Sequence, residues 1–178
     1  MEKLSVIIPA RNEEGCIAST IQTLYEKLVS EDIPHELVIV NDGSTDQTQA
    51  IVEKLELNIP SITLINNAGP NGFGYAVRRG LASFSGDAVA LFMADASDSP
   101  EDLVRFYRKL QEGFDCVFGN RWDKGGATFD YPIVKKLINR IANGFIRILL
   151  QTGYDDVTNA FKMYRRQVIE GIQPILSC

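Results

Sequence analysis

The chain has 178 residues, of which 45% are hydrophobic and 23% are charged, and its formal net charge is −5. This length is enough for one domain with a sizeable core, while the acidic balance argues against a general nucleic-acid binder, whose affinity depends mainly on Lys and Arg. No apolar run reaches the roughly eighteen residues that indicate a membrane-spanning helix, so we expect none.

Segments typical of strands and of helices alternate along the chain. We expect strands at 4–8, 37–40, 62–65, 88–93, 116–119 and 160–164, where mainly apolar segments are typical of strands. We expect helices at 14–29, through 51–55, at 75–84, at 100–112 and at 132–150. This order predicts one α/β domain over residues 1–178, with a mostly parallel central sheet flanked by helices. The chain ends on Ile-Leu-Ser-Cys without a polar tail, so we expect a domain truncated at its C-terminal end.

The cysteines and the first residues indicate where the protein resides. Cys16, Cys116 and Cys178 are odd in number, far apart and without metal-type spacing, which favours reduced thiols. No charged leader precedes the apolar run that begins at Leu4. We therefore expect a cytoplasmic protein. The only histidine, His35, lies in a turn-like stretch, and we expect it at the surface and outside the catalytic machinery.

Polar clusters follow four of the predicted strands. They are Pro9 to Glu13, Asn41 to Ser44, the glycine loop from Asn66 to Gly74, and Asp95 to Ser99. Because parallel strands end at a common edge, we expect these clusters to converge on a nucleotide site. The glycine loop follows the third strand with reversed spacing, so it is no dinucleotide fingerprint, and no Walker sequence occurs. The alternative for its glycines is a tight loop that needs positive φ.

The stretch after the fourth apolar run is rich in acids and hydroxyls. The run 88–93 is followed by Asp95 and Asp98, and two carboxylates beyond a strand end can hold a hard divalent cation against phosphate oxygens. The alternative is that Asp95, Ser97, Asp98 and Ser99 cap the helix that follows.

Six segments, in this order, carry a resemblance to a known family. They are Val6-Ile7-Ile8-Pro9-Ala10-Arg11-Asn12-Glu13-Glu14, Val38-Ile39-Val40-Asn41-Asp42-Gly43-Ser44-Thr45-Asp46, Gly72-Phe73-Gly74 with Ala76 and Gly80, Asp95 with Pro100-Glu101, Gly119-Asn120-Arg121, and Asp155 to Lys162. In these segments the chain resembles the inverting family-two glycosyltransferases of the GT-A fold, within them the dolichyl-phosphate mannose synthase-like branch. The resemblance implies a membrane-associated transferase that moves a mannose- or glucose-type hexose from a nucleoside-diphosphate sugar to a polyprenyl or dolichyl phosphate with inversion.

The resemblance also implies how the donor, a UDP- or GDP-hexose, is bound. The residues it assigns to the donor are Pro9, Arg11, Glu13, Val40, Asp42, Gly72, Ala94, Asp95 and Ser97. Asp42 is well suited to accept a hydrogen bond from an N–H of uracil or guanine. Asp95 corresponds to the metal-binding member of the family's Asp-x-Asp motif, with Mg²⁺ or Mn²⁺ bridging the diphosphate.

The metal motif departs from the family pattern. It reads Met93-Ala94-Asp95, with Met93 where the family usually has its first Asp. A thioether is a poor ligand for a hard cation, so the site has either lost one carboxylate or moved it to Asp98. We expect Asp95 and Asp98 as metal ligands, with a weakened affinity for the metal.

Arg121 and Lys124 are the acceptor-side candidates. The resemblance places Arg121 against the acceptor phosphate, and with Asp95 it is the expected catalytic pair. A phosphate monoester, with a second pKa of about 6, is already largely ionised at pH 7 and needs positioning cations more than a base. For both residues a solvated loop is the alternative; function is favoured for Arg121, and the choice stays open for Lys124.

Two further features leave alternatives open. The helix at 132–150 carries Lys135, Lys136, Arg140 and Arg147 among aliphatics, and it either lies on an anionic bilayer or packs into the core. Asp155, Asp156 and Asn159 either contact the acceptor or cap a helix. Two other functions remain: transfer to a saccharide hydroxyl in cell-wall or surface polysaccharide synthesis, with Asp155 or Asp156 as base, and non-catalytic nucleotide binding, which Met93 suggests.

Overall fold

A computed structural model describes residues 2–120, 133–151, 153–154 and 156–172 of the chain. It divides into two compact units, one formed by residues 1–117 with 161–178 and the other by residues 118–160. The single domain expected over residues 1–178 stays a prediction. Among the described residues, no helix is long and apolar enough to cross a membrane.

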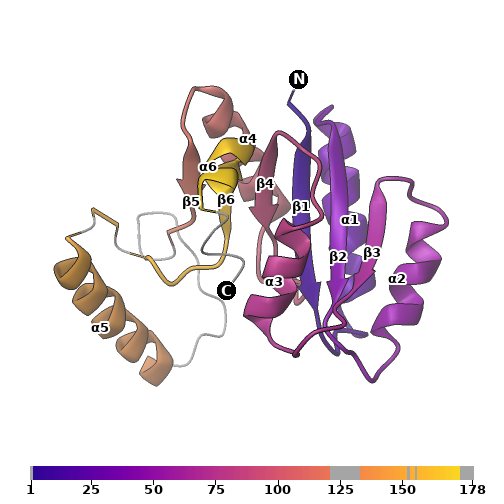
Figure 1. The fold of residues 1–178 in the computed structure, drawn as a ribbon, viewed down its shortest axis with the longest axis horizontal. Coiled ribbons are helices and arrows are strands. Elements are labelled where there is room, and N and C mark those ends of the chain that lie inside the picture. The colour runs from indigo at the N-terminus through magenta and orange to yellow at the C-terminus, as the bar shows by residue number, and fades with distance from the viewer. Residues whose placement is uncertain (1, 121–132, 152, 155, 173–178) are drawn as a thin grey trace. The chain divides into compact units, whose positions relative to one another are not determined.

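The first unit contains most of the secondary structure (Figure 1). Its elements are β1 (Leu4–Ala10), α1 (Ile17–Ser30), β2 (His35–Asn41), α2 (Thr48–Glu56), β3 (Ile62–Asn66), α3 (Phe73–Leu81), β4 (Ala88–Leu91), α4 (Pro100–Gln111), most of β5 (Cys116–Phe118), β6 (Lys162–Arg165) and α6 (Arg166–Gly171). The second unit contains α5 (Ile133–Leu150). Every predicted strand and helix is present with shifted ends, whereas α6 was not predicted.

Six strands form one sheet in the order β3-β2-β1-β4-β6-β5. β1 pairs in parallel with β2 and with β4, and β2 pairs in parallel with β3, while β6 runs antiparallel to β4. The mostly parallel sheet is thereby confirmed. In the register, Ala10 pairs with Asn41, which pairs with Asn66. The ends of β1, β2 and β3, and the loops that follow them, therefore meet at one edge.

Both faces of the sheet are covered, which explains the continuous apolar runs of the strands. Side chains alternate between the faces: Val6 and Ile8 lie in the core cluster with α1, α2 and α4, whereas Ile7 and Val38 lie with α3 and α6 (Figure 1). A Cβ at Gly80 would lie 2.4 Å from Cγ2 of Ile7. Glycine there lets α3 approach β1 closely, with its N-terminus at the edge where the parallel strands end.

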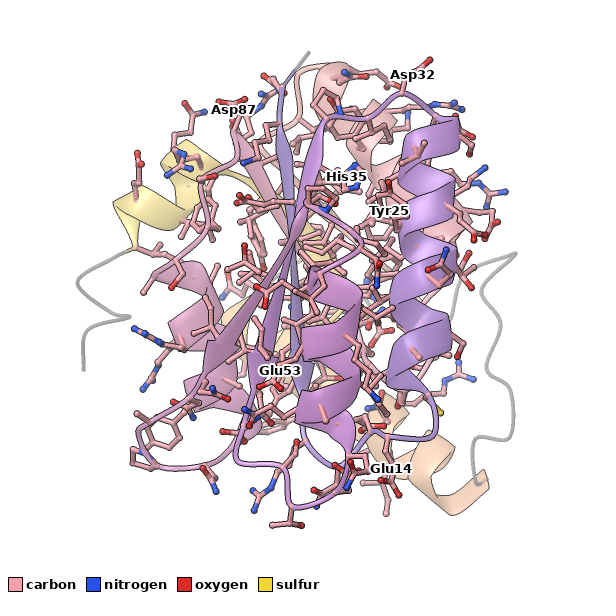
Figure 2. The ribbon with its side chains drawn as sticks, turned by 90° about the vertical axis from the view of Figure 1, so that its right-hand side faces the viewer. Glu14, Tyr25, Asp32, His35, Glu53 and Asp87 are labelled. Carbon is pink, nitrogen blue, oxygen red and sulfur yellow. The ribbon has the colours of Figure 1, made fainter. Side chains whose placement is uncertain are left out.

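The opposite edge of the sheet is closed by a charged network around Glu36. Its carboxylate accepts hydrogen bonds from Lys3 Nζ at 2.7 Å, from Ser5 Oγ at 2.6 Å and from both the amide and the hydroxyl of Ser85 at 2.6 Å. Burial raises the pKa of Glu36, but these hydrogen bonds outweigh it and lower the pKa to about 2. Asp87 marks this edge in Figure 2, and Glu14 marks the other.

His35 corrects one expectation. It is not a surface turn residue but the first residue of β2, half-buried. Its Nδ1 lies 2.8 Å from the carbonyl oxygen of Ile33, and its ring makes an edge-on contact with Tyr25 of α1 at 5.7 Å (Figure 2). These contacts give His35 a structural role at the start of the strand.

Candidate functional site

The loops after β1 and β2 interlock at the edge where the parallel strands end. The amide of Asn12, whose φ is 56°, donates to Ser44 Oγ at 3.1 Å, and its side-chain Oδ1 accepts the Thr45 amide at 2.8 Å. The amide of Glu13 donates to Thr48 Oγ1 at 2.8 Å. The carbonyl of Glu13 accepts hydrogen bonds from the amides of Cys16 at 3.0 Å and Ile17 at 2.9 Å, in a turn that precedes α1. The helix begins at Ile17, three residues later than predicted. These hydrogen bonds therefore join the polar clusters after β1 and β2 into one network.

Asp42 connects this hydrogen-bond network to the glycine loop. Its side chain is only 3% exposed, and it accepts 2.7 Å hydrogen bonds from Asn67 Nδ2 and from the amide of Gly72. Gly72 has a φ of 147°, whereas Gly69 and Gly74 have no positive φ, so the tight-turn explanation holds for one of the three predicted glycines.

Asp95 projects from a turn that is held on both sides. The Phe92 amide donates to the Ile7 carbonyl at 2.9 Å, and Thr20 Oγ1 donates to the Ala94 carbonyl at 3.0 Å. The exposed Asp95 side chain accepts the Ser97 amide at 3.0 Å. This arrangement presents a carboxylate to solvent from a fixed backbone.

Asp98 has a different environment, although it is only three residues away. Its Oδ2 accepts the Met93 amide at 2.8 Å, so its carboxylate ties the turn back to the end of β4. The helix cap is Ser99, whose hydroxyl accepts the Asp102 amide at 3.3 Å. The capping alternative is therefore right for Ser99, and the capping contact of α4 involves neither Asp95 nor Asp98.

Glu13 and Asp95 face the same region. Burial raises the pKa of Glu13, and the negative charges of Asp95 and Asp46 raise it further. A site with this excess of negative charge favours a cation. In the described ranges, however, no group of three or more His, Cys, Asp or Glu side chains is placed to hold a metal. The protein offers Asp95 as an open carboxylate, which fits Mg²⁺-type binding by one or two carboxylates together with substrate phosphates and water.

The other expected donor residues differ in accessibility. Arg11 and Ser97 are exposed. Pro9 and Val40 are paired neighbours in β1 and β2 and are buried, and Ala94 is 2% exposed. The side chain of Val40 lies in the core cluster with α3, so only its backbone is left for a ligand. The donor-binding roles of all these residues stay predictions.

On the acceptor side, Arg121, Lys124 and Asp155 lie outside the described residues. Asp156 is 4% exposed, and its carbonyl accepts the Asn159 amide at 3.4 Å. Asn159 Nδ2 donates to the carbonyl of Gly119 at 3.0 Å, two residues before Arg121 in the sequence. The hydrogen bonds of Asn159 therefore hold its own unit together.

Helix α5 is polar toward its own unit and apolar on its exposed side. Asn143, 2% exposed, donates to Thr158 Oγ1 at 3.0 Å. The most exposed apolar side chains of the helix lie on one helical face: Ile138, Ile141, Phe145 and Ile148 recur at intervals of three or four residues, and Leu149 follows Phe145 by four. The helix contains four basic residues and no acidic one.

Asn67 and Thr48 were missed as site residues. Both owe their place to contacts with residues far away in the sequence: Asn67 is 25 residues from Asp42, and Thr48 is 35 residues from Glu13. An Asn that follows a strand or a Thr that begins a helix gives no spacing signal of its own. Only the strand order could have pointed to them.

Comparisons with known proteins identify the family of the chain. A sequence model of the family described as glycosyl transferase family 2 matches residues 5–172. A dolichol-phosphate mannosyltransferase from Pyrococcus furiosus is 31% identical, and a polyprenol monophosphomannose synthase from Mycolicibacterium smegmatis is 30% identical, each over 96% of this chain. The match covers 48% of the first protein and 64% of the second, so the chain spans about half to two thirds of these relatives.

Solved structures share the fold. A glucosyl-3-phosphoglycerate synthase from Mycobacterium tuberculosis, in complex with Mn²⁺, UDP and phosphoglyceric acid, matches with a TM-score of 0.71 and 23% identity over 94% of this chain and 57% of that one. A mannosyltransferase from Pyrobaculum calidifontis, in complex with GDP-Man and Mn²⁺, matches with a TM-score of 0.65 and 20% identity over 96% and 46%. The predicted GT-A type of fold is confirmed.

Proposed function

This chain belongs to glycosyl transferase family 2, and on that premise we propose that it transfers a hexose from a nucleoside-diphosphate sugar to a polyprenyl phosphate. The observation that carries the proposal is the edge where the parallel strands end, at which the buried Asp42 and the exposed Asp95 follow different strands. Two relatives of about 30% identity are named for mannosyl transfer to dolichol phosphate or polyprenol, which supports the lipid acceptor.

Donor binding divides into a base end and a phosphate end. At the base end, Asp42 accepts an N–H of uracil or guanine, with Pro9, Arg11 and the backbone of Val40 alongside. At the phosphate end, Asp95 would hold the divalent cation, and Asp98 is the second candidate ligand. The two structurally similar proteins bind UDP or GDP-Man together with Mn²⁺. This supports the division and leaves both uracil and guanine as candidates for the base of the donor.

The divalent cation would neutralise the charge that grows on the leaving nucleoside diphosphate. The rigid turn that carries Asp95 keeps its carboxylate oriented before the donor arrives, because backbone and Thr20 hydrogen bonds hold the turn. Preorganised charge of this kind needs no rearrangement during the reaction. Because Met93 stands where the family usually has its first Asp, the metal motif has one carboxylate fewer. We therefore expect a weak affinity for the free cation.

The transfer itself is a direct displacement with inversion. An oxygen of the acceptor phosphate forms a bond to the anomeric carbon as the bond to the nucleoside diphosphate breaks. No proton has to leave, because the phosphate is already ionised. Arg121 and Lys124 supply the cations that orient it; a guanidinium fork suits phosphate oxygens.

Transfer to a saccharide hydroxyl is the less favoured alternative. It needs a carboxylate base that is open to the acceptor. Of the two candidates for that base, Asp156 is 4% exposed, which argues against it, and Asp155 lies outside the described residues. A purely nucleotide-binding role is also less favoured, because the two relatives of about 30% identity are named as a mannosyltransferase and a monophosphomannose synthase.

A polyprenyl phosphate has to be reached at a membrane, and α5 offers a surface for that contact. Its exposed apolar face and four basic residues, in a chain of net charge −5, suit the interface of an anionic bilayer. We expect peripheral binding at the cytoplasmic face. The free thiols of Cys16 and Cys116 are consistent with a reducing compartment.

Calorimetric titration tests the donor site. UDP and GDP are titrated into the whole chain with and without Mn²⁺, and the titration is repeated on Asp95→Asn. We expect Mn²⁺-dependent binding of one nucleotide and about a tenfold or greater loss in the variant, because a metal ligand is removed. Asp32→Asn, the same substitution in the exposed turn after α1, serves as the control and should bind normally.

Two results would count against this proposal. If neither nucleotide binds with Mn²⁺, the chain has no working donor site. If Asp95→Asn binds as tightly as the unaltered chain while Mn²⁺ is required, the cation is held elsewhere.

A further inference from the structure

The Asp42 carboxylate is bonded by the protein on both of its oxygens. Oδ1 accepts from Asn67 Nδ2 and Oδ2 accepts from the Gly72 amide, both at 2.7 Å. A carboxylate with two oxygens has about four acceptor positions. Two of them are used, and the two bonds from one loop determine which directions remain for a ligand.

Asn67 is the centre of this arrangement. Its amide donates to the Asn41 carbonyl at 2.9 Å, and its side-chain Oδ1 accepts the Gly69 amide at 3.3 Å. Its Nδ2 donates both to Asp42 and to the Pro70 carbonyl at 3.1 Å. The orientation of its side-chain amide follows from chemistry, because a carboxylate only accepts and must face the NH₂ group. Asn67 therefore joins the end of β2 to the glycine loop.

The same loop closes over the turn after Asp42. Gly43 has a φ of 68°, and a Cβ there would lie 2.8 Å from Nδ2 of Asn71. The loop is thus packed directly on the backbone next to Asp42. Because Asp42 is almost fully buried, rotation of its side chain would leave a buried charge without partners, which is costly.

We propose that Asn67 is a positioning residue for the nucleobase: its amide holds the Asp42 carboxylate in the one orientation in which the remaining oxygen lone pairs accept the ring N–H of the donor base. This inference rests on the proposed function, because it takes Asp42 as the group that recognises the base. Asn67 itself needs no contact with the base. Its role depends on the donating NH₂ group and not merely on its size.

Asn67→Asp removes that NH₂ group. The substitution keeps the shape of the side chain and the oxygen that accepts from Gly69, but it removes both hydrogen bonds donated by Nδ2 and sets a second carboxylate against Asp42. Asn67→Ala removes all the side-chain contacts without adding charge. If the hydrogen bonds donated by the NH₂ group matter, Asn67→Asp should weaken nucleotide binding more than Asn67→Ala does. If only the shape of the side chain matters, Asn67→Asp should bind like the unaltered protein.

The test measures binding to the whole chain by calorimetry with Mn²⁺ present, using whichever of UDP and GDP binds more tightly. Inorganic pyrophosphate is the second probe, since it lacks a base and reports the phosphate end alone. We expect Asn67→Asp to weaken nucleotide binding about tenfold or more and Asn67→Ala to weaken it less, as for loss of a charge-assisted hydrogen bond. Pyrophosphate binding should not change.

Asn58→Asp is the matched control, because Asn58 is exposed beyond α2 and its Nδ2 donates to the carbonyl of Lys54, which lies in the same helix, at 2.8 Å. It should bind like the unaltered chain. The inference is overturned if Asn67→Asp binds the nucleotide as tightly as the unaltered chain, or if pyrophosphate binding falls by the same factor. If the unaltered chain binds neither nucleotide, the proposed donor site fails first, and the inference fails with it.

Discussion

Glu13 lies in the loop after β1, in the field of two other carboxylates. Because burial, Asp95 and Asp46 raise its pKa, ionised Glu13 opposes folding, and its contribution to stability falls as the pH rises from about 4.3 through the raised value. We expect Glu13→Gln to stabilise the metal-free chain at pH 7 by no more than about 0.5 kcal/mol and to weaken Mn²⁺-dependent nucleotide binding. Urea unfolding at pH 4 and pH 7, with calorimetry, measures both effects.

Glu26→Gln is the control for this change, since Glu26 is an exposed residue of α1, and it should alter neither quantity. A Glu13→Gln protein that is less stable at pH 7 than at pH 4, relative to the unaltered chain, would contradict the charge argument. Undiminished binding would separate Glu13 from the cation.

At the scale of elements, Glu36 holds β1, β2 and the loop before β4 together through Lys3, Ser5 and Ser85. Its pKa of about 2 is below the unfolded value of about 4.3. Its contribution is therefore complete above about pH 4.3 and is lost as the pH falls toward 2. We expect Glu36→Gln to lower the free energy of unfolding by about 1–3 kcal/mol at pH 7, measured by urea denaturation.

The same difference should shrink steadily between pH 4 and pH 2, which distinguishes loss of a charge from loss of packing. Glu53→Gln, on the exposed side of α2 (Figure 2), should have little effect at any pH. A cost for Glu36→Gln that does not change with pH would mean that the network stabilises through shape and not through ionisation.

At the scale of the whole molecule, the exposed apolar face of α5 and its basic residues predict binding to anionic vesicles. Ile141 and Ile148 are 64% and 80% exposed, so both are available to a bilayer. We expect the double variant Ile141→Ser with Ile148→Ser to lose about tenfold or more in affinity for phosphatidylglycerol vesicles. Sedimentation with vesicles measures this, and neutral vesicles should bind the unaltered chain much less.

Leu57→Ser is the control, because Leu57 is 87% exposed just after α2 but has no basic helix around it. Equal binding by the double variant would remove α5 as the membrane contact. A change in oligomeric state in place of vesicle binding would mean that a second copy covers this face.

Much of this fold and part of its site could be read from the sequence, because the relevant signals are local. Buried strands flanked by helices produce apolar runs and stripes, and Ser99 before Pro100 marks a helix start. The order of these elements also indicated that the polar loops that contain Asp42 and Asp95 would lie at the same edge of the sheet. Each of the family motifs lies within one short continuous segment, which is why the family could be identified from the sequence.

Tertiary structure alone decided which of these groups bond to one another. Asp95 and Asp98 are the same residue type three positions apart, yet one is open to solvent and the other is bonded to the Met93 amide. Asp42 finds its partners 25 and 30 residues away. Such hydrogen bonds depend on strand order and register, which bring distant segments together, and no local pattern of residue types specifies those distances.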